Sequence, residues 1–383
     1  MSTPRDAIGY GRQFVDQDDV DAVVGVLRGE RLTQGDAVPA FEESLVRATR
    51  AGHAVAVANG TVALELAYLA LDVGRGSRVV TTANTFLATA SAAVRTGAQV
   101  DFVDVDPHTW NLDVDELAAL CAGPEAPDVV TVVHFAGLAC DMQSVLDLKR
   151  RHGFRLIEDA AHALGARYVA DGRAWEVGEH PDVDATTLSF HPVKLVTTGE
   201  GGAVLTHDAE LAARLRRLRE HGLDRLVPDL APVPMVELGT NGRLSDLQAA
   251  LGWSQLKKLP EFLAGRREIA LRYVGELRDF ELPTPGSAGN EHAWHLFCIH
   301  VDADERDGLR RHLAAHDIQT QVHYHPVPHQ PWFRAFGCRG HWPHAEHHGR
   351  AALSLPIYPA LSEHDQERVL SALTAWRRTR AAV

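Results

Sequence analysis

The chain has 383 residues, more than one average domain, and its 45% hydrophobic content with 31 glycines is typical of a globular α/β protein rather than a disordered one. Its 38 basic and 51 acidic residues give a net charge of −13 without a long basic run, so neither nucleic acid nor an anionic membrane is an expected partner. No stretch is long and apolar enough to span a bilayer, the polar N-terminus lacks a signal-peptide pattern, and the four cysteines are scattered, which predicts a cytoplasmic protein with reduced thiols.

The first 50 residues predict two helices, near 17–28 and 38–50, joined by a loop at 31–35. Strands and helices then alternate up to residue 206. The expected strands are 55–58, 78–81, 99–103, 129–135, 155–158, 187–190 and 203–206, and the expected helices are 61–71, 86–96 and 142–152. This alternation predicts a mostly parallel sheet covered by helices on both faces, with ligands bound at the carboxyl ends of the strands.

A phosphate site is predicted where the first of these strands ends. Asn59-Gly60 is a turn signal, and Thr61 opens an amphipathic helix. A glycine turn into a helix N-terminus offers backbone N–H groups and the positive end of a dipole to a phosphate. Many strand-turn-helix units look alike, so this motif gains weight only together with others.

Asp159 ends the buried stretch 155–158 and is followed by His162. A carboxylate here could pair with the ring nitrogen of pyridoxal 5′-phosphate, whose protonated ring is an electron sink, and His162 could stack on that ring or contact its 3-oxygen. The alternative for Asp159 is a helix N-cap.

Lys194 lies in a loop just past a strand, because His191-Pro192 ends the run 187–190. The glycines of 199–202 then turn the chain into the strand 203–206. A lysine presented in this way suits a Schiff base with pyridoxal 5′-phosphate. The alternative is a solvated lysine in an ordinary hairpin.

Beyond residue 209 the pattern becomes helical and leads into a smaller domain. Expected helices are 211–221, 245–258, 261–278, 304–316 and 362–378, expected strands are 294–301 and 320–324, and expected loops are 227–238 and the Pro/Gly segment 282–289. We therefore predict a large domain at 1–258 and a small C-terminal α+β domain at 259–383.

Ordered motifs along nearly the whole chain resemble the DegT/DnrJ/EryC1/StrS sugar aminotransferases, which are fold-type-I pyridoxal phosphate enzymes. They are Arg31-Leu32-Thr33-Gln34-Gly35, Asn59-Gly60-Thr61, Asn84-Thr85-Phe86 with Ala88-Thr89-Ala90, Glu158-Asp159-Ala160-Ala161-His162, Ser189-Phe190-His191-Pro192-Val193-Lys194, Gly199-Glu200-Gly201-Gly202 and Asn241-Gly242-Arg243-Leu244-Ser245-Asp246.

The resemblance implies a transaminase in which Lys194 forms the Schiff base with the cofactor and Asp159 pairs with its ring nitrogen. It also implies further cofactor contacts: Phe86 on the ring, His162 at the 3-oxygen, Gly60, Thr61 and Ser189 on the phosphate, and Asn241 from the neighbouring subunit. The implied partners are L-glutamate as amino donor and a nucleotide-linked ketosugar as acceptor, and the implied assembly is a homodimer with shared active sites.

Within the family, the segments 191–200 and 323–331 resemble the branch that aminates C4 of a UDP-linked 4-keto-6-deoxy-N-acetylhexosamine, on the pseudaminic acid route. The expected substrate-binding residues are Arg31, His191, Arg243, His323, Tyr324 and His325. The match is imperfect, because His325 stands where an aliphatic residue is commoner. The open alternatives are a dTDP-linked 3- or 4-keto-6-deoxyhexose, and more remotely a cyclitol or aminohydroxybenzoate substrate.

The remaining histidines predict no metal site, because the spacing of His323, His325, His329 and of those at 341–348 lacks supporting cysteine or acidic residues. We expect 323–329 to be a substrate loop and 341–348 a solvated loop. A non-catalytic regulatory relative is the alternative to an enzyme. Lys194 together with Asp159 argues against it, and also against related dehydratases, in which histidine replaces the lysine.

Overall fold

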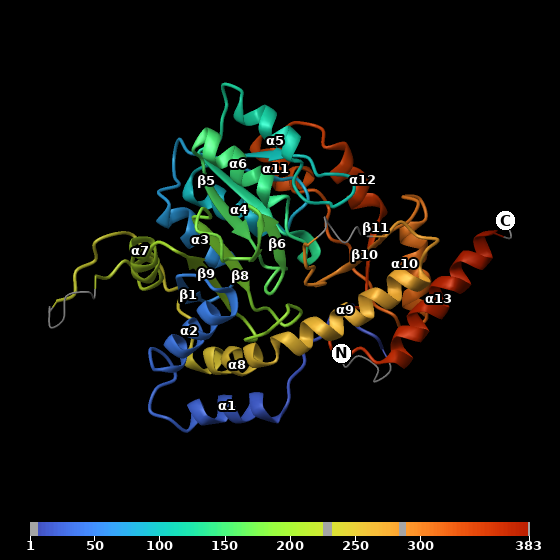
Figure 1. The fold of residues 1–383 in the computed structure, drawn as a ribbon, viewed down its shortest axis with the longest axis horizontal. Coiled ribbons are helices and arrows are strands. Elements are labelled where there is room, and N and C mark those ends of the chain that lie inside the picture. The colour runs from blue at the N-terminus through green and yellow to red at the C-terminus, as the bar shows by residue number, and fades with distance from the viewer. Residues whose placement is uncertain (1–6, 225–231, 283–288, 382–383) are drawn as a thin grey trace.

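The computed structural model describes residues 7–224, 232–282 and 289–381. Its centre is a seven-stranded sheet in the order β1-β9-β8-β5-β4-β2-β3. Figure 1 labels β1, β9, β8 and β5 of this sheet. The strands are β1 (His53–Val57), β2 (Arg78–Thr82), β3 (Gln99–Val103), β4 (Val129–Val133), β5 (Arg155–Asp159), β8 (Ala185–Ser189) and β9 (Gly202–Thr206). Neighbours from β3 to β8 are parallel, whereas β9 is antiparallel to both β8 and β1. The predicted mostly parallel α/β sheet is confirmed.

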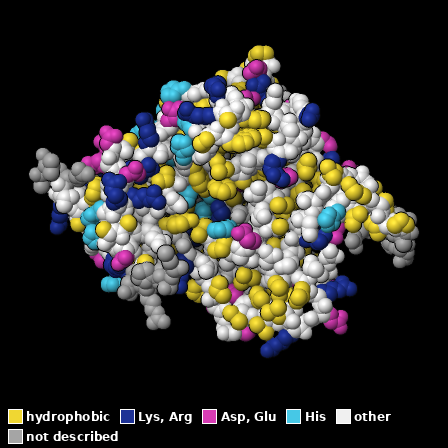
Figure 2. Space-filling model, turned by 180° about the vertical axis from the view of Figure 1, so that it is seen from behind, with side chains coloured by type: hydrophobic (Ala, Val, Ile, Leu, Met, Phe, Trp, Pro, Cys, Tyr) yellow, Lys and Arg dark blue, Asp and Glu magenta, His cyan; other side chains and the backbone are white. Residues whose placement is uncertain are grey.

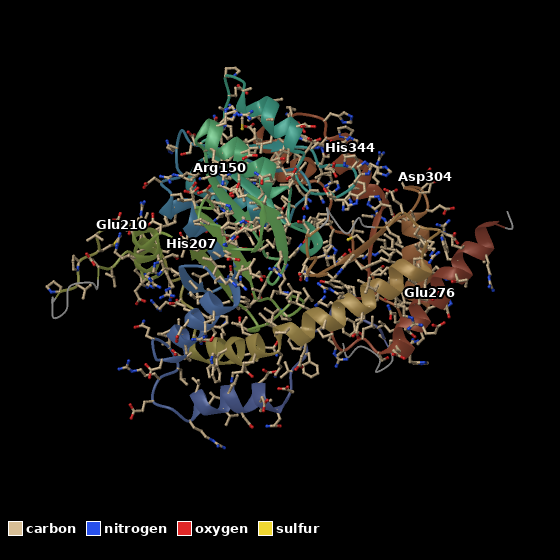
Figure 3. The ribbon with its side chains drawn as sticks, in the orientation of Figure 1. Arg150, His207, Glu210, Glu276, Asp304 and His344 are labelled. Atoms are coloured by element: carbon tan, nitrogen blue, oxygen red, sulfur yellow. The ribbon has the colours of Figure 1, made fainter. Side chains whose placement is uncertain are left out.

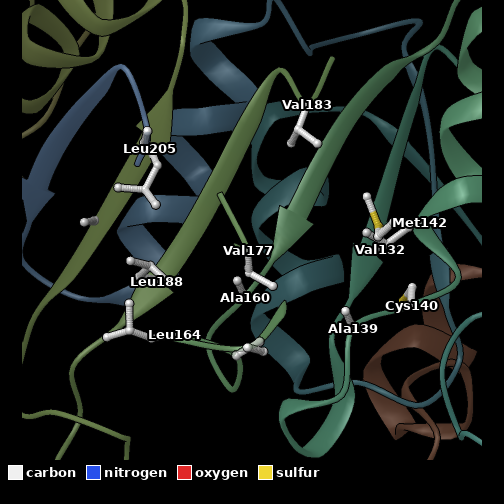
Figure 4. Close-up of a cluster of buried hydrophobic side chains, with 14 of the residues drawn as sticks. Val132, Ala139, Cys140, Met142, Ala160, Leu164, Val177, Val183, Leu188 and Leu205 are labelled. Carbon is white, nitrogen blue, oxygen red and sulfur yellow. The ribbon is translucent and has the colours of Figure 1, made fainter. Parts of the chain in front are cut away.

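Helices cover both faces of this sheet because alternate strand residues point to opposite sides. One core packs β-strand residues such as Val130 and Leu156 against α2 (Ala37–Thr49), α5 (Val114–Cys121), α6 (Met142–His152) and α8 (Asp246–Lys257). Figure 4 shows part of this core around Val132 and Met142. The other core packs Val129 and Ile157 against α3 (Gly60–Ala70), α4 (Leu87–Thr96) and α7 (Ala209–Arg219).

The C-terminal part has a separate hydrophobic core. It involves α9 (Leu259–Glu276), β10 (Phe297–His300), α10 (Arg306–Ala315), β11 (Ala352–Leu355) and α13 (Glu363–Ala381). A further cluster joins residues of both parts, among them Phe102, Phe135, Leu296 and Trp342. The domain boundary between 258 and 259 stays a prediction, since α8 and α9 follow each other directly at this point.

Two predictions for the C-terminal part are wrong. Residues 320–324 do not form a strand: Gln321 makes a single bridge to Ser354, and the amide of Tyr324 then donates to the Asn84 side chain (3.1 Å) instead of continuing a ladder. Residues 341–348 are no solvated loop, because α12 (Pro343–Ala351) begins there and buries His348. The carboxylate of Asp104 accepts from the first amides of this helix, which a local pattern cannot reveal.

Several short elements were not predicted. They are α5, the hairpin β6 (Arg167–Ala170) with β7 (Arg173–Glu176), the short helix α11 (Pro331–Phe336) and β11. The helix predicted near 17–28 is α1 (Gln17–Leu27). The predicted loop 227–238 lies partly, and the segment 282–289 mostly, outside the described residues. Among the described helices, none contains a stretch both long and apolar enough to cross a bilayer.

Candidate active site

A cavity of about 1210 Å³ lies at the carboxyl ends of the sheet strands. Its wall contains most of the predicted cofactor- and substrate-binding residues, namely Gly60, Thr61, Phe86, Asp159, His162, Ser189, His191, Lys194, His323 and Tyr324. These residues come from five separate stretches of sequence, and the sheet brings them together because β1, β5 and β8 end on the same side.

Asp159 is the last residue of β5 and is buried. Its Oδ2 accepts from the Thr89 hydroxyl (2.7 Å), and its Oδ1 accepts from the Ala161 amide (3.2 Å). Burial raises the pKa of this carboxyl, while the two hydrogen bonds and the charge of Lys194 act against that rise. No α-helix follows β5 directly, so the alternative of a helix N-cap is wrong, and the carboxylate is held at the cavity wall.

Lys194 lies in the loop between β8 and β9, where its amide donates to the carbonyl of His191 (2.9 Å). The residue is half-buried in the cavity wall. Loss of hydration lowers the pKa of its amine to about 8, and the nearby charge of Asp159 works in the opposite direction. The amine is therefore far more available as a base or nucleophile near neutral pH than that of a solvated lysine.

The N-terminus of α3 forms one end of the cavity. The side chain of Asn59 caps the helix by accepting from the amide of Val62 (2.9 Å). A Cβ on Gly60 would lie 3.0 Å from the Cβ of Ser189, and a Cβ on Gly202 would lie 2.6 Å from the Asn59 backbone. Glycine at both positions lets three backbone segments meet tightly around the positive end of α3.

Aromatic and imidazole rings form another wall. The Tyr324 hydroxyl lies 3.2 Å from Nε2 of His162, and the ring of Phe86 lies 6.0 Å from that of Tyr324. His162 also packs on His295, with 4.4 Å between the ring centroids. Burial, together with the charge of Lys194, lowers the pKa of His162 well below its ordinary value, so this imidazole is neutral.

Four nominated residues do not line the cavity. Arg31 is exposed and donates to the carbonyl of Gln34 (3.3 Å), and His325 is exposed. Asn241 is exposed on the segment beside the end of β1, and Arg243 pairs with Glu220 (3.2 Å). Within one chain, these four side chains are outside the pocket that holds the other nominated residues.

The sequence did not reveal the contacts of several residues that shape the cavity. Thr89 donates a hydrogen bond to Asp159, Gly202 packs on Asn59, and His295 packs on His162. Thr89 and Gly202 belong to motifs recognised in the sequence, but only the folded chain shows what they touch. His295 lies 133 positions after its partner in a segment without a motif, so no sequence signal identifies it.

A family model described as the DegT/DnrJ/EryC1/StrS aminotransferase family matches residues 13–374. A curated relative, UDP-4-amino-4-deoxy-L-arabinose–oxoglutarate aminotransferase from Shewanella sediminis, is 34% identical over 387 aligned positions, covering 95% of this chain and 96% of the relative.

Two solved structures have the same fold. Helicobacter pylori PseC, an aminotransferase involved in the biosynthesis of pseudaminic acid, is 28% identical with a TM-score of 0.90, over 96% of this chain and 98% of that one. The PLP-form of a putative sugar aminotransferase from Streptococcus pneumoniae is 26% identical with a TM-score of 0.88, over 95% and 97%.

Proposed function

This chain belongs to the DegT/DnrJ/EryC1/StrS aminotransferase family and is a sugar aminotransferase, and on that premise we propose that it uses pyridoxal 5′-phosphate to move the amino group of L-glutamate to a nucleotide-linked ketosugar. The preferred acceptor position is C4 of a UDP-linked 4-keto-6-deoxy-N-acetylhexosamine. The cofactor proposal rests on one observation: Lys194, Asp159 and the N-terminus of α3 lie at the same cavity.

The residues fit pyridoxal 5′-phosphate at each of its functional groups. Gly60, Thr61 and Ser189 would hold the phosphate, since the glycine cradle brings the positive end of α3 next to Ser189. Asp159 would pair with the ring nitrogen, Phe86 would cover the ring, and the neutral His162 would lie at the 3-oxygen. The bound cofactor would supply the electron sink for the amino-group transfer.

The chain's own groups then have distinct tasks. The amine of Lys194, whose pKa burial lowers to about 8, would take the proton from Cα of the amino donor, and in the second half of the reaction it would give a proton to the acceptor carbon. Burial raises the pKa of Asp159, and the hydrogen bonds that Thr89 and Ala161 donate to the carboxylate oppose this rise by favouring its charged form. The buried rings of His162 and His295 exclude water from this side of the cavity.

The choice of acceptor is supported by the two relatives. The Shewanella protein is named for a UDP-linked 4-amino sugar and for oxoglutarate, which is what glutamate becomes when it loses its amino group. PseC acts in pseudaminic acid biosynthesis. His191, His323 and Tyr324 line the cavity and are the candidate acceptor contacts. The large volume of about 1210 Å³ leaves room for a nucleotide sugar beside the cofactor.

The decisive experiment is a panel of UDP- and dTDP-linked 3- and 4-ketosugars, each assayed with L-glutamate for release of 2-oxoglutarate. The UDP-linked 4-keto-6-deoxy-N-acetylhexosamine should give the highest kcat/KM. Faster turnover of a dTDP-linked ketosugar would overturn the substrate proposal while keeping the reaction. No turnover of any donor and acceptor pair by cofactor-loaded protein would instead support a regulatory relative.

We further propose a two-fold dimer whose active sites are shared, with Asn241 reaching the phosphate of the neighbouring chain. In support, Asn241 is exposed and does not line the cavity of its own chain. Large apolar side chains that a monomer would leave in water include Leu87, Met235 and Leu238. Hydrophobic side chains also gather over the middle of the face seen in Figure 2.

Subunit exchange between Lys194→Ala and Asn241→Ala proteins tests the shared site. In a hybrid dimer one site inherits both defects and the other inherits neither, so activity should rise above that of either parent. Unchanged activity in a demonstrated heterodimer would place both residues in the same site of one chain. A cytoplasmic location remains a prediction from the sequence.

A further inference from the structure

Three potential metal ligands meet outside the cavity, on the C-terminal part of the chain. Glu281 follows α9, His300 ends β10, and His347 lies on α12. Their ligand atoms all lie within 4.8 Å of one another. No metal site was predicted among the histidines of 341–348 because their spacing lacks supporting cysteine or acidic residues. Glu281 and His300 lie far from these histidines along the chain.

Backbone hydrogen bonds fix the three segments beside one another. The amide of His300 donates to the carbonyl of Glu281 (2.9 Å), and the amide of Val301 donates to that of Ala351 (3.2 Å), at the end of α12. The His300 ring is buried and packs against Trp110, with 4.1 Å between centroids. One ligand is therefore rigid, whereas the side chains of Glu281 and His347 are exposed and free to adjust.

The hydrogen bonds of His348 determine which nitrogen of His300 carries its proton. Nε2 of His348 lies 2.7 Å from the carbonyl oxygen of His323, which can only accept, so this nitrogen donates. In the neutral imidazole the proton on Nε2 leaves Nδ1 of His348 as an acceptor. That Nδ1 lies 2.9 Å from Nε2 of His300, which must therefore be the donor.

In the neutral ring of His300, the proton on Nε2 leaves Nδ1 with a lone pair. This atom is buried and has no hydrogen-bond partner among the described residues. It lies 3.7 Å from a carboxylate oxygen of Glu281, which is also an acceptor. Two acceptors that face each other need a cation or a donor between them.

We propose that Glu281, His300 and His347 bind a divalent transition-metal ion of the zinc class. Two imidazole nitrogens and one carboxylate oxygen suit zinc, which often takes three protein ligands and one water, whereas magnesium prefers oxygen ligands alone. Tetrahedral zinc would bring the ligand atoms to about 3.3 Å from one another, so the two exposed side chains need only close in on the fixed His300. His348 provides the outer hydrogen bond that orients a ligating imidazole.

Such an ion would tie the end of α9, β10 and α12 together without touching the reacting groups. The test is zinc titration of the cofactor-loaded protein, with any affinity tag removed, by calorimetry and by thermal unfolding. We expect one zinc per chain and a higher Tm. His347→Ala and Glu281→Gln should each weaken zinc binding by about tenfold or more and abolish the Tm shift, and magnesium should cause neither effect.

His344→Ala is the matched control, since this exposed histidine of α12, labelled in Figure 3, does not belong to the three-ligand group. It should bind zinc like the native protein. Equal zinc binding by His347→Ala and the native protein would mean adventitious binding to surface histidines only and would overturn the site. An equal response to magnesium would overturn the zinc class. Both readouts are independent of the transaminase assay.

Discussion

The most informative single change is Thr89→Val, because it alters Asp159 without touching the carboxylate itself. The Thr89 hydroxyl has one proton and gives it to Oδ2 of Asp159 at 2.7 Å. Its short contact with the Thr85 hydroxyl, also 2.7 Å, must then have Thr85 as the donor. The relay therefore runs from Thr85 through Thr89 to the carboxylate, and valine at 89 removes its last step.

The size of the effect follows from the type of hydrogen bond. A buried hydrogen bond to a charged group contributes about 1.5–3 kcal/mol. Its loss raises the pKa of Asp159, so the shared proton moves away from the ring nitrogen of the proposed cofactor and the electron sink weakens. If the whole loss falls on the transition state, the half-reaction with glutamate slows roughly 10- to 150-fold.

Single-turnover kinetics with glutamate, followed by the change in the cofactor's visible absorbance, measure this rate. Thr85→Val is the matched control, since it removes a neutral hydrogen bond one step further from the carboxylate and should have the smaller effect. A Thr89→Val rate within threefold of the native rate, or a loss equal to that of Thr85→Val, would refute the role assigned to the relay.

Three other predictions concern the same pair of charged groups. Lys194→Ala should keep the fold and lose transamination, and borohydride should no longer fix the cofactor to the protein, as mass spectrometry would show; an active variant would contradict the proposal. Asp159→Asn should slow the glutamate half-reaction more than Thr89→Val does. A rate near the native one would contradict the catalytic role proposed for the Asp159 carboxylate. Burial lowers the pKa of Lys194 from 10.5 to about 8, so between these pH values the unfolded cofactor-free chain binds a proton that the folded chain lacks. The stability of native protein relative to Lys194→Met, measured by urea unfolding, should therefore rise with pH across this window, and a flat difference would contradict the shift.

The local sequence pattern was enough to predict an element where the spacing of its hydrophobic residues and the turn residues at its ends indicate the same structure. The predicted strand 99–103 and helix 142–152 match β3 and α6. Gly60 and Lys194 follow strand ends as expected, and Asp159 is itself the last residue of β5. These elements have buried, regular faces that carry their own signal. Many cavity residues could be predicted for the same reason, since strand ends and glycine turns can be recognised in the amino-acid sequence.

Elements that depend on distant partners were missed or misjudged. The start of α12 is capped by Asp104, and the Trp342 indole donates to the carbonyl of Phe102 (2.9 Å), so a histidine-rich stretch that looks like a solvated loop becomes a helix. The hairpin of β6 and β7 is half polar and short, and it gives no clear alternation. Side-chain relays such as Thr89 to Asp159 join residues 70 positions apart, which no local window contains.

Burial perturbs Asp159 and Lys194 in opposite directions, and both shifts favour the neutral forms. A ligand that places a positive charge beside the Asp159 carboxylate and reacts with the Lys194 amine would remove the free-energy cost of burying each group. A pyridine ring with an aldehyde does both at once, whereas a phosphate or a sugar alone does neither. Part of the binding free energy of the proposed cofactor would therefore come from relieving the unfavourable burial of Asp159 and Lys194. This linkage explains why one cavity wall combines a hydrogen-bonded carboxylate, a half-buried lysine and neutral imidazoles, and it predicts that Lys194→Met, which relieves one of the two, should raise the stability of the cofactor-free chain below pH 8.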